Sequence, residues 1–258
     1  MPMKTTRNIL VIDVGGTHVK IMASGHREIR KMVSGPALTP RQMVTGVRKL
    51  AQGWAFDAVA IGYPGPVAHD HPTAEPHNLG GGWVRFDYRK AFGKPVRMVN
   101  DAAMQALGDY NGRKMLFLGF GTGLGTTLIV DGVLIPMELA HLPYRKATFE
   151  DYVGEQALLR QGKRKWRDNV EDVVSILSAA LLPDDIVLGG GNAVHIKTLP
   201  PKCRRGENSR AFPGGFRLWA EAPAKRSPAK RAAAKPARPA RRGPSAQPAT
   251  RPRAAAKG

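Results

Sequence analysis

The sequence has a single cysteine, Cys203, among its 258 residues. One thiol cannot form a disulfide within the chain, and it cannot by itself build a cysteine-based zinc site. Proteins without disulfides are typical of reducing compartments. We therefore expect a cytoplasmic protein without a cysteine-based zinc site.

Long hydrophobic runs are also absent. No stretch approaches the 18 or so apolar residues that a membrane-spanning helix needs. Near the start, Lys4 and Arg7 precede a short apolar run that ends at Asp13, too early for a signal peptide. The sequence thus predicts no membrane association.

Acidic residues are scarce: 20 Asp and Glu stand against 40 Lys and Arg, which gives a formal net charge of +20. Residues 220–258 carry 11 of these basic residues and one acidic residue, Glu221, among many Ala and Pro. A segment of this composition has too little apolar surface to form a core, so we expect a disordered basic tail. Such a tail can bind polyanions, either polyphosphate or nucleic acid, or it can simply raise solubility.

Residues 7–219 alternate short apolar runs with helical patterns, which indicates an α/β protein. Strands are expected at residues 7–14, 17–24, 27–33, 57–61, 96–99, 114–120, 125–130 and 186–189. Helices are expected at residues 39–50, from Asp101 to about Tyr110, and from about Trp166 to Leu182. The first three strands are close enough in sequence to form an antiparallel meander.

The first candidate phosphate site is Asp13-Val14-Gly15-Gly16-Thr17. Two glycines after a strand let backbone N–H groups approach an anion, Thr17 adds a hydroxyl donor, and Asp13 can hold Mg²⁺ directly or through water. An ordinary hairpin turn explains the same pattern.

Two further glycine-rich turns follow strands, at Gly121-Thr122-Gly123 and at Gly189-Gly190-Gly191. The first stands within a run in which glycine alternates from Gly119 to Gly125. Glycines in strands weaken them, so a close approach by another group is expected there. A phosphate chain is one candidate, and internal packing is the other.

Carboxylates and one histidine supply candidates for sugar chemistry. Asp101 follows Asn100 at a strand-to-helix junction, where it is either a plain helix cap or a base that accepts a hydroxyl proton. Glu138, His141 and Glu150 could bind adjacent hydroxyl groups of a sugar, although an isolated Glu-x-x-His pair is more often a surface pair.

Taken in order, DVGGT, PGPV, NLGGGW, NDA, GTGLG, ELAH and GGGNA resemble the ROK family of sugar kinases and repressors. Within the family, the chain is most similar to polyphosphate-dependent glucokinases. The resemblance covers about residues 7–219. It implies the actin-like ATPase (ribonuclease H-like) fold, with an N-terminal lobe at 1–112, a C-terminal lobe at 113–219 and the tail at 220–258.

The resemblance also implies roles for individual residues. It makes Asp101 the catalytic base, assigns the three glycine motifs to phosphate binding and Asp13 to Mg²⁺. The sugar would be bound by Asn78, Asn100, Asp101, Glu138, His141 and Glu150. Many family members carry a cysteine-rich zinc motif after the histidine, whereas this chain has LPYRKATF there. The departure implies Mg²⁺ and no zinc, with His141 in direct contact with the sugar.

The implied activity is transfer of a phosphoryl group to the 6-hydroxyl of glucose, by a homodimer. The part of the chain after Gly191 is short for a full adenine pocket, which favours inorganic polyphosphate over ATP as donor. Two alternatives stay open: an ATP-dependent hexokinase for another sugar such as mannose or fructose, and a non-catalytic sugar sensor with a polyanion-binding tail.

Overall fold

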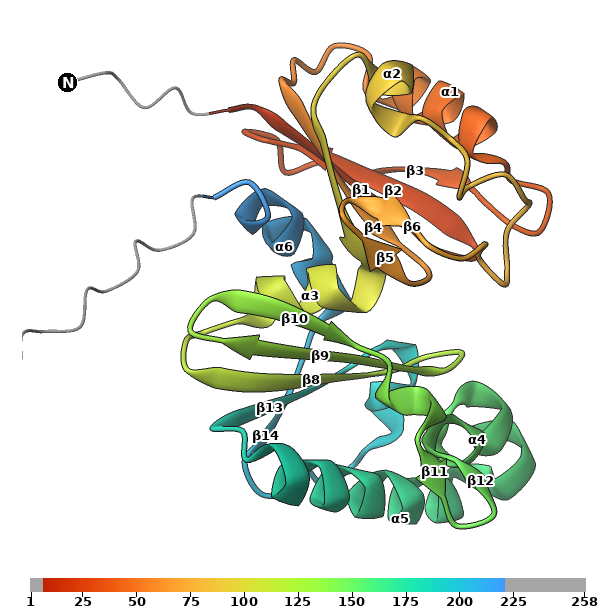
Figure 1. Ribbon diagram of the computed structural model, residues 1–258, viewed down its shortest axis with the longest axis vertical. Coiled ribbons are helices and arrows are strands. Elements are labelled where there is room, and N and C mark those ends of the chain that lie inside the picture. Colours follow the sequence, from red (N-terminus) through yellow and green to blue (C-terminus); the bar gives the residue numbers. More distant parts are fainter. Residues whose placement is uncertain (1–6, 221–258) are drawn as a thin grey trace, which may run out of the picture. The chain divides into compact units, whose positions relative to one another are not determined.

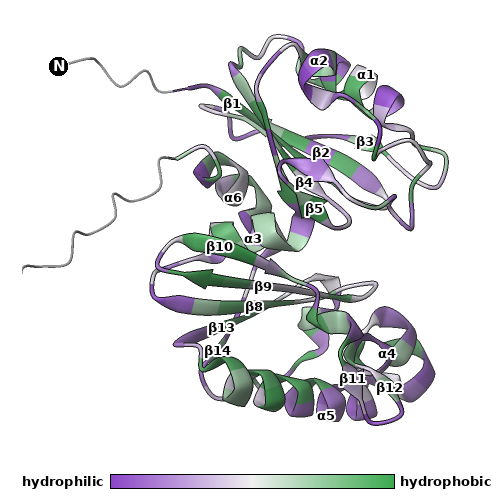
Figure 2. Ribbon diagram, in the orientation of Figure 1, coloured by the Kyte–Doolittle hydropathy of each residue, from purple (hydrophilic) through white to green (hydrophobic). Residues whose placement is uncertain are grey.

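The computed structural model describes residues 7–220, and the basic tail lies outside the described residues apart from Ala220. The described part contains two five-stranded sheets (Figure 1). Hydrophobic residues concentrate on the strands of both sheets (Figure 2). Among residues 7–220, no helix is long and apolar enough to cross a membrane. The predicted α/β class is confirmed.

The first sheet combines an antiparallel meander with two parallel strands. Its order is β3-β2-β1-β4-β7, and both β4 and β7 run parallel to β1. The strands are β1 (Ile9–Val14), β2 (His18–Ala23), β3 (Arg30–Val33), β4 (Ala58–Tyr63) and β7 (Val96–Asn100). The loop after β4 carries a two-stranded ribbon, β5 (Val67–Ala68) with β6 (His71–Pro72).

Helix α1 (Pro40–Leu50) shows why the sequence pattern was readable. Thr39 and Gln42 form a reciprocal capping box, and Pro40 occupies the first turn, where no backbone N–H is needed. Met43, Val44 and Val47 are buried against the sheet, in the core that the short helix α2 (Tyr88–Phe92) also joins.

The second sheet has the order β10-β9-β8-β13-β14. Its strands are β8 (Lys114–Phe120), β9 (Leu124–Val130), β10 (Val133–Met137), β13 (Asp185–Gly189) and β14 (Cys203–Arg205). Its core includes helices α4 (Phe149–Val153) and α5 (Glu155–Leu181). Small elements accompany it: η1 (Leu139–His141), η2 (Gly191–His195) and a separate ribbon of β11 (Pro143–Tyr144) with β12 (Ala147–Thr148). The short helix η3 (Asn208–Arg210) contacts α3 (Asp101–Asp109) and α6 (Ala211–Arg217).

Helix α5 begins earlier than the sequence predicts. The apolar stripe indicated a start near Trp166, whereas helical structure begins at Glu155 and is interrupted at Gly162, whose φ is 76°. The segment before the interruption is short and mostly polar, so its helical period was not visible. Strand β10 was also missed.

Helix α3 contacts both sheets, and helix α6 packs beside it. Helix α3 (Asp101–Asp109) contacts β4, β7, β8 and β9. Helix α6 (Ala211–Arg217), which the sequence did not predict, follows the second sheet but packs against β1, β4 and α3. Phe212 of α6 is buried in one cluster with Val11, Ala60 and Met104. The division into lobes at residue 112 remains a prediction, and α6 shows that the first sheet also needs residues from beyond it.

Candidate active site

Asp13 lies at the carboxyl end of β1 and faces Lys20 across the β1–β2 hairpin. The two residues are register partners, and their carboxylate Oδ2 and ammonium Nζ are 3.8 Å apart. Burial raises the pKa of Asp13, and the charge and hydrogen bond of Lys20 act in the opposite direction. Asp13 is therefore a desolvated carboxyl group whose ionised form is stabilised by a cation beside it.

The Gly15-Gly16 turn joins these two strands. The N–H of Gly15 donates to the carbonyl of His18 at 3.0 Å, so that donor belongs to the turn and not to a ligand. A Cβ at Gly16 would lie 3.5 Å from the Cβ of Asn78, which places Asn78 beside the loop. Thr17 is exposed at the tip. The donors open to a phosphate are thus those of the Gly16–Thr17 side of the turn.

Asp101 is the first residue of α3, directly after the edge strand β7 (Figure 1). Because β1, β4 and β7 are parallel, their carboxyl ends meet at one edge of the sheet, and Asp13 and Asp101 share that edge. A Cβ at Gly62, on the strand between them, would lie 2.4 Å from the Met104 side chain and 3.5 Å from the Cα of Asp101. Glycine at 62 therefore lets α3 sit close to the sheet.

The surroundings of Asp101 raise the pKa of its carboxyl group. Burial, together with the negative charges of Asp13 and Glu138, raises its pKa to about 7, and backbone N–H groups, that of Ala102 first, oppose the shift. The amide N of Ala102 is 2.8 Å from the Asp101 Oδ1. A carboxylate with a pKa near neutrality suits a general base.

Asn100 is the cap of α3. Its Oδ1 accepts hydrogen bonds from the N–H groups of Ala102 and Ala103, at 2.9 and 3.3 Å. Its Nδ2 donates to the carbonyl of Gly65 at 3.1 Å. The side chain thus fixes the Gly65 loop to the start of α3, and only the second Nδ2 hydrogen is left to bind a sugar.

The alternating glycines of the β8–β9 hairpin have three different neighbours. A Cβ at Gly125 would be 2.7 Å from the Cβ of Ala102, and one at Gly119 would be 3.1 Å from the Phe117 ring. A Cβ at Gly123 would be 2.0 Å from the Glu150 Oε2, whereas one at Gly121 would meet no atom within 4 Å. Packing of α3, Phe117 and Glu150 therefore explains three of these glycines, and Gly121 is the one of the four that is open to a ligand.

Glu150, predicted to bind sugar, accepts a hydrogen bond from the second glycine turn. Its Oε2 accepts the N–H of Leu124 at 3.2 Å, and the N–H of Glu155 donates to the carbonyl of Thr122 at 3.1 Å. These bonds hold the 121–124 turn against the start of α4 and α5. The remaining carboxylate oxygen is the one that could contact a sugar.

The third glycine turn packs on the second. A Cβ at Gly190, whose φ is +82°, would lie 2.3 Å from the Phe120 carbonyl, and one at Gly189 would lie 2.6 Å from the Phe117 ring. The Asn192 Nδ2 donates to the Gly121 carbonyl at 3.1 Å. Gly189 and Gly190 are therefore packing glycines, while Gly191 is open.

Glu138 directly precedes the short helix η1, and His141 is its last residue. The Thr126 hydroxyl donates to the Met137 carbonyl at 2.7 Å and accepts the Leu139 N–H at 3.1 Å, which fastens this segment to β9. Glu138 is close enough to Asp101 to raise its pKa. His141 lies near Asp151 in α4, whose pKa is lowered by hydrogen bonds from Thr148 and, more weakly, by the His141 charge.

The structure therefore brings Asp13, Asp101 and Glu138 into one electrostatic site. No group of three His, Cys, Asp or Glu residues within 7–220 has the arrangement of a metal centre made by protein alone. Magnesium is commonly bound through one or two carboxylates together with substrate phosphates and water. The single desolvated carboxylate of Asp13 fits that kind of site.

Lys20 is the residue that the sequence analysis missed. The connection between the strands takes up residues 15–18, so that Val14 pairs with Val19 and Asp13 with Lys20. A two-residue turn at 15–16, counted from the sequence, would instead pair Asp13 with His18. Its side chain is 43% exposed, so the ammonium group that partly neutralises Asp13 also faces solvent.

Comparisons with known proteins bear on the family and the fold. Residues 9–136 match the ROK family. The polyphosphate glucokinase of Mycobacterium tuberculosis H37Rv is 27% identical over 210 residues, which cover 72% of this chain and 78% of that protein. A solved inorganic polyphosphate/ATP-glucomannokinase from Arthrobacter sp. strain KM superposes with a TM-score of 0.70 at 22% identity, over 81% of this chain and 97% of that one.

A ROK family glucokinase from Streptomyces griseus, solved with glucose and AMPPNP, has a TM-score of 0.67 at 15% identity and covers 82% of this chain and 98% of its own. These similarities confirm the predicted actin-like ATPase fold. Residues 9–136 of the chain form a ROK family domain.

Proposed function

We propose that this protein is a glucokinase that transfers a phosphoryl group from inorganic polyphosphate, or from ATP, to the 6-hydroxyl of glucose. The observation that carries the proposal is Asp101, a carboxyl group with a pKa of about 7 at the edge of the sheet where the Gly16–Thr17 turn and Asp13 also lie. Relatives named as polyphosphate glucokinases support the donor and the sugar.

In the proposed reaction, Asp101 takes the proton of the glucose O6 hydroxyl. The oxygen forms a bond to the terminal phosphorus, and the bond from that phosphorus to the bridging oxygen of the donor breaks, so the shortened donor leaves with the electron pair. Lys20 and Thr17 would stabilise charge on the transferred group. Magnesium bound through Asp13 would neutralise donor charge. The second Nδ2 hydrogen of Asn100, Asn78, Glu138, His141 and the free oxygen of Glu150 would orient the sugar.

The test is a donor and acceptor comparison with purified full-length protein. Polyphosphate and ATP are each offered with glucose, mannose and fructose, and product formation is measured as sugar 6-phosphate. We expect the largest kcat/KM for polyphosphate with glucose. A larger value for ATP with another sugar would identify a different hexokinase, and no transfer with any pair, together with glucose binding, would identify a sensor.

Asp13 is expected to set the magnesium dependence. Asp13→Ala should raise the Mg²⁺ concentration for half-maximal rate by about 10-fold or more, because metal sites lose affinity on that scale when a supporting group is removed. Titration of the rate with Mg²⁺ measures this. Glu28→Ala, which removes an exposed carboxylate paired with Arg30, is the control. An unchanged Mg²⁺ titration would exclude Asp13 from this role.

His141 is expected to bind sugar without zinc. His141→Ala should raise the KM for glucose and leave kcat within about 10-fold, because a group that binds substrate and transition state equally affects mainly KM. Elemental analysis of the wild-type protein should find no stoichiometric zinc. His26→Ala, which removes a histidine packed on Trp54, is the control. One zinc per chain would contradict the assignment.

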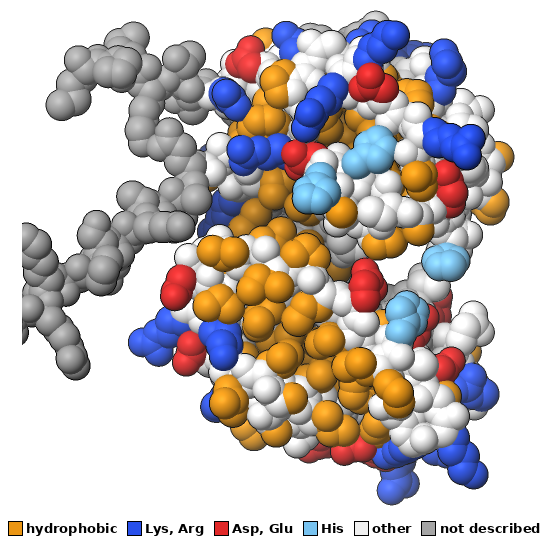
Figure 3. Space-filling model, viewed as in Figure 1, with side chains coloured by type: hydrophobic (Ala, Val, Ile, Leu, Met, Phe, Trp, Pro, Cys, Tyr) orange, Lys and Arg blue, Asp and Glu red, His pale blue; other side chains and the backbone are white. Residues whose placement is uncertain are grey.

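The proposed homodimer has a candidate surface. Strand β10 is an edge of the second sheet, and its Val133 and Ile135 are 62% and 40% exposed. In Figure 3, hydrophobic side chains gather on the visible face of the region that contains the second sheet. Sheet edges and apolar patches of this kind are the surfaces that partners cover.

A further inference from the structure

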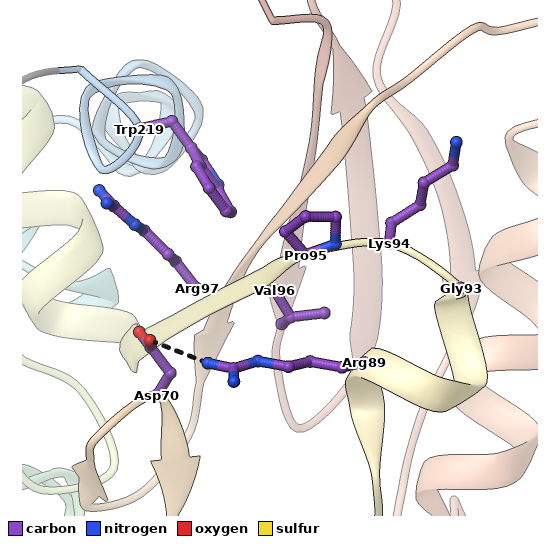
Figure 4. Close-up of a pocket in the computed structure, with 8 residues that line it drawn as sticks. All are labelled: Asp70, Arg89, Gly93, Lys94, Pro95, Val96, Arg97 and Trp219. Carbon is purple, nitrogen blue, oxygen red and sulfur yellow. Dashed lines mark hydrogen bonds and ion pairs between the residues drawn. The ribbon is translucent and has the colours of Figure 1, made fainter.

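A pocket of about 460 Å³ lies at the start of strand β7, at the opposite end of that strand from Asp101 (Figure 4). Its walls come from α2, from the turn before β7, and from the residues that follow α6. The lining residues are Asp70, Arg89, Gly93, Lys94, Pro95, Val96, Arg97 and Trp219. None of them has a role in the proposed phosphoryl transfer.

The pocket is basic. Three cations, Arg89, Lys94 and Arg97, line it against one carboxylate, Asp70. That carboxylate is already engaged: Oδ1 accepts the Met98 N–H at 3.2 Å and Oδ2 lies 3.5 Å from the Arg89 guanidinium. Within residues 7–220, neither Lys94 nor Arg97 has an ion pair within 4 Å. Two positive charges are thus left for a ligand.

Trp219 holds one of these cations in place. The Arg97 guanidinium lies 4.7 Å from the centre of the indole ring and also donates to the Leu218 carbonyl. The Arg7 guanidinium lies over the same ring at 5.3 Å, and the indole N–H donates to the Val59 carbonyl at 3.2 Å. The indole therefore fixes two like charges at one place, an arrangement that an anion would stabilise.

The same contacts argue against a nucleic acid. Single-stranded nucleic acids are bound by stacking their bases on open aromatic rings in a basic groove. Here two guanidinium groups occupy the ring surface of Trp219. The described lining supplies charge and hydrogen-bond donors, and no other aromatic ring. This chemistry suits an anionic chain that has no aromatic groups.

The sequence beyond the pocket has the same sign of charge. The described chain ends at Ala220, next to Trp219, and residues 221–258 contribute 11 basic residues and one acidic residue. Positive charge in the pocket and positive charge in this part of the sequence both attract a polyanion.

We propose that this pocket is a second binding site for inorganic polyphosphate, separate from the active site; the inference rests on the proposed use of polyphosphate as donor. Arg97 and Asp101 are four residues apart on one strand and the helix that follows it, roughly 13 Å at about 3.3 Å per residue. A long chain held at the pocket would therefore stay near the active site, which raises its effective concentration there. A triphosphate is too short to use both sites.

The test measures direct binding of long-chain inorganic polyphosphate to the full-length protein, without glucose or Mg²⁺. The variant Arg89→Gln/Lys94→Gln should raise the Kd for polyphosphate by about 5–30 fold at low salt. It should also lower the slope of log Kd against log salt concentration by about one to two. The matched control, Lys163→Gln/Arg164→Gln, removes two exposed cations from α5 and should change Kd far less. Because Arg89→Gln also frees Asp70, Lys94→Glu alone serves as a second variant.

Kinetics separate this site from the proposed function. In the pocket variant, the KM for long polyphosphate should rise while kcat and the KM values for triphosphate and glucose stay unchanged. If polyphosphate supports no turnover but its binding still depends on the pocket, the site stands and the proposed donor is wrong. If turnover occurs and both variants weaken binding equally, the site is wrong and the donor stands. An oligonucleotide that binds as tightly, with the same loss in the variant, would also overturn the assignment.

Discussion

Asp101→Asn is expected to lower kcat by about 10²–10⁴ fold, the scale on which a positioned general base contributes. Asparagine keeps the size of the side chain and its ability to accept the Ala102 N–H, but it cannot take a proton from a sugar hydroxyl. The glucose KM should change much less than kcat. The measurement is steady-state kinetics with the preferred donor, and a variant with near wild-type kcat would contradict the role.

A matched control exists in the same part of the fold. Asp87 caps α2 through a hydrogen bond to the N–H of Lys90 at 2.9 Å and lies at the exposed surface. Asp87→Asn is expected to leave kcat unchanged, because it alters a helix start without touching the proposed site. Equal losses of kcat in both variants would point to a general effect on folding.

The pH dependence follows from the same carboxyl group. With a pKa of about 7 for Asp101, the base is ionised above that pH and protonated below it. The kcat/KM of the wild-type protein should therefore fall as the pH drops below about 7, with a slope of one proton. A flat profile down to pH 5 would mean that the base has an ordinary carboxyl pKa.

Stability offers a second readout of this group. Because the folded-state pKa lies above the unfolded value near 3.8, the folded protein holds the proton more tightly, and ionisation of Asp101 destabilises it as the pH rises from about 4 to 7. Asp101→Asn removes that cost, at most about 4 kcal/mol. The variant should gain stability at pH 8 relative to pH 4. A plain helix cap would show the reverse, since a stabilised anion is lost in the variant.

The sequence was sufficient for the elements whose signals are local. The capped helix at Thr39-Pro40 and the short strands between glycine turns were predicted close to their observed bounds. Strand β10 (Val133–Met137) was missed although its residues are apolar, whereas helix α6 has a weak local signal. Helix α6 contains Pro213, Gly214 and Gly215 and owes its place to contacts with α3 and β1.

The sequence predicted which residues end the strands at the candidate site, but it did not predict which residues pack against the glycines. Sequence order placed Asp13 and Asp101 at strand ends, and the parallel strands bring them to one edge of the sheet. What the glycines accommodate depends on tertiary packing: Gly125 makes room for Ala102, and Gly123 for Glu150. A motif in one dimension does not distinguish a glycine that admits a phosphate from one that admits a helix.

The crossing of α3 and α6 depends on two such glycines. A Cβ at Gly214 would lie 1.7 Å from the Met104 carbonyl oxygen and 2.9 Å from the Gly108 nitrogen, and one at Gly108 would lie 1.8 Å from the Arg210 carbonyl oxygen. On the other side of α6, a Cβ at Gly215 would be 2.3 Å from a methyl group of Val11. Helix α6 is thus wedged between backbone on one side and β1 on the other, with no side chain whose rotation could relieve a clash with α3.

Gly214→Ala is therefore expected to lower the free energy of unfolding by about 1–3 kcal/mol, and Gly214→Val by more, because the obstructing atoms are backbone. The helix propensity of alanine acts in the opposite direction by up to about 1 kcal/mol. Gly46→Ala is the matched control: that glycine is also helical, but its Cβ would meet only the flexible Met32 side chain. Urea unfolding of the three variants measures the difference. Since α3 begins at Asp101, displacement of the helix should also lower kcat in the Gly214 variants. If Gly214→Ala unfolds at the same urea concentration as Gly46→Ala, close approach of the two helices does not hold this part of the fold together.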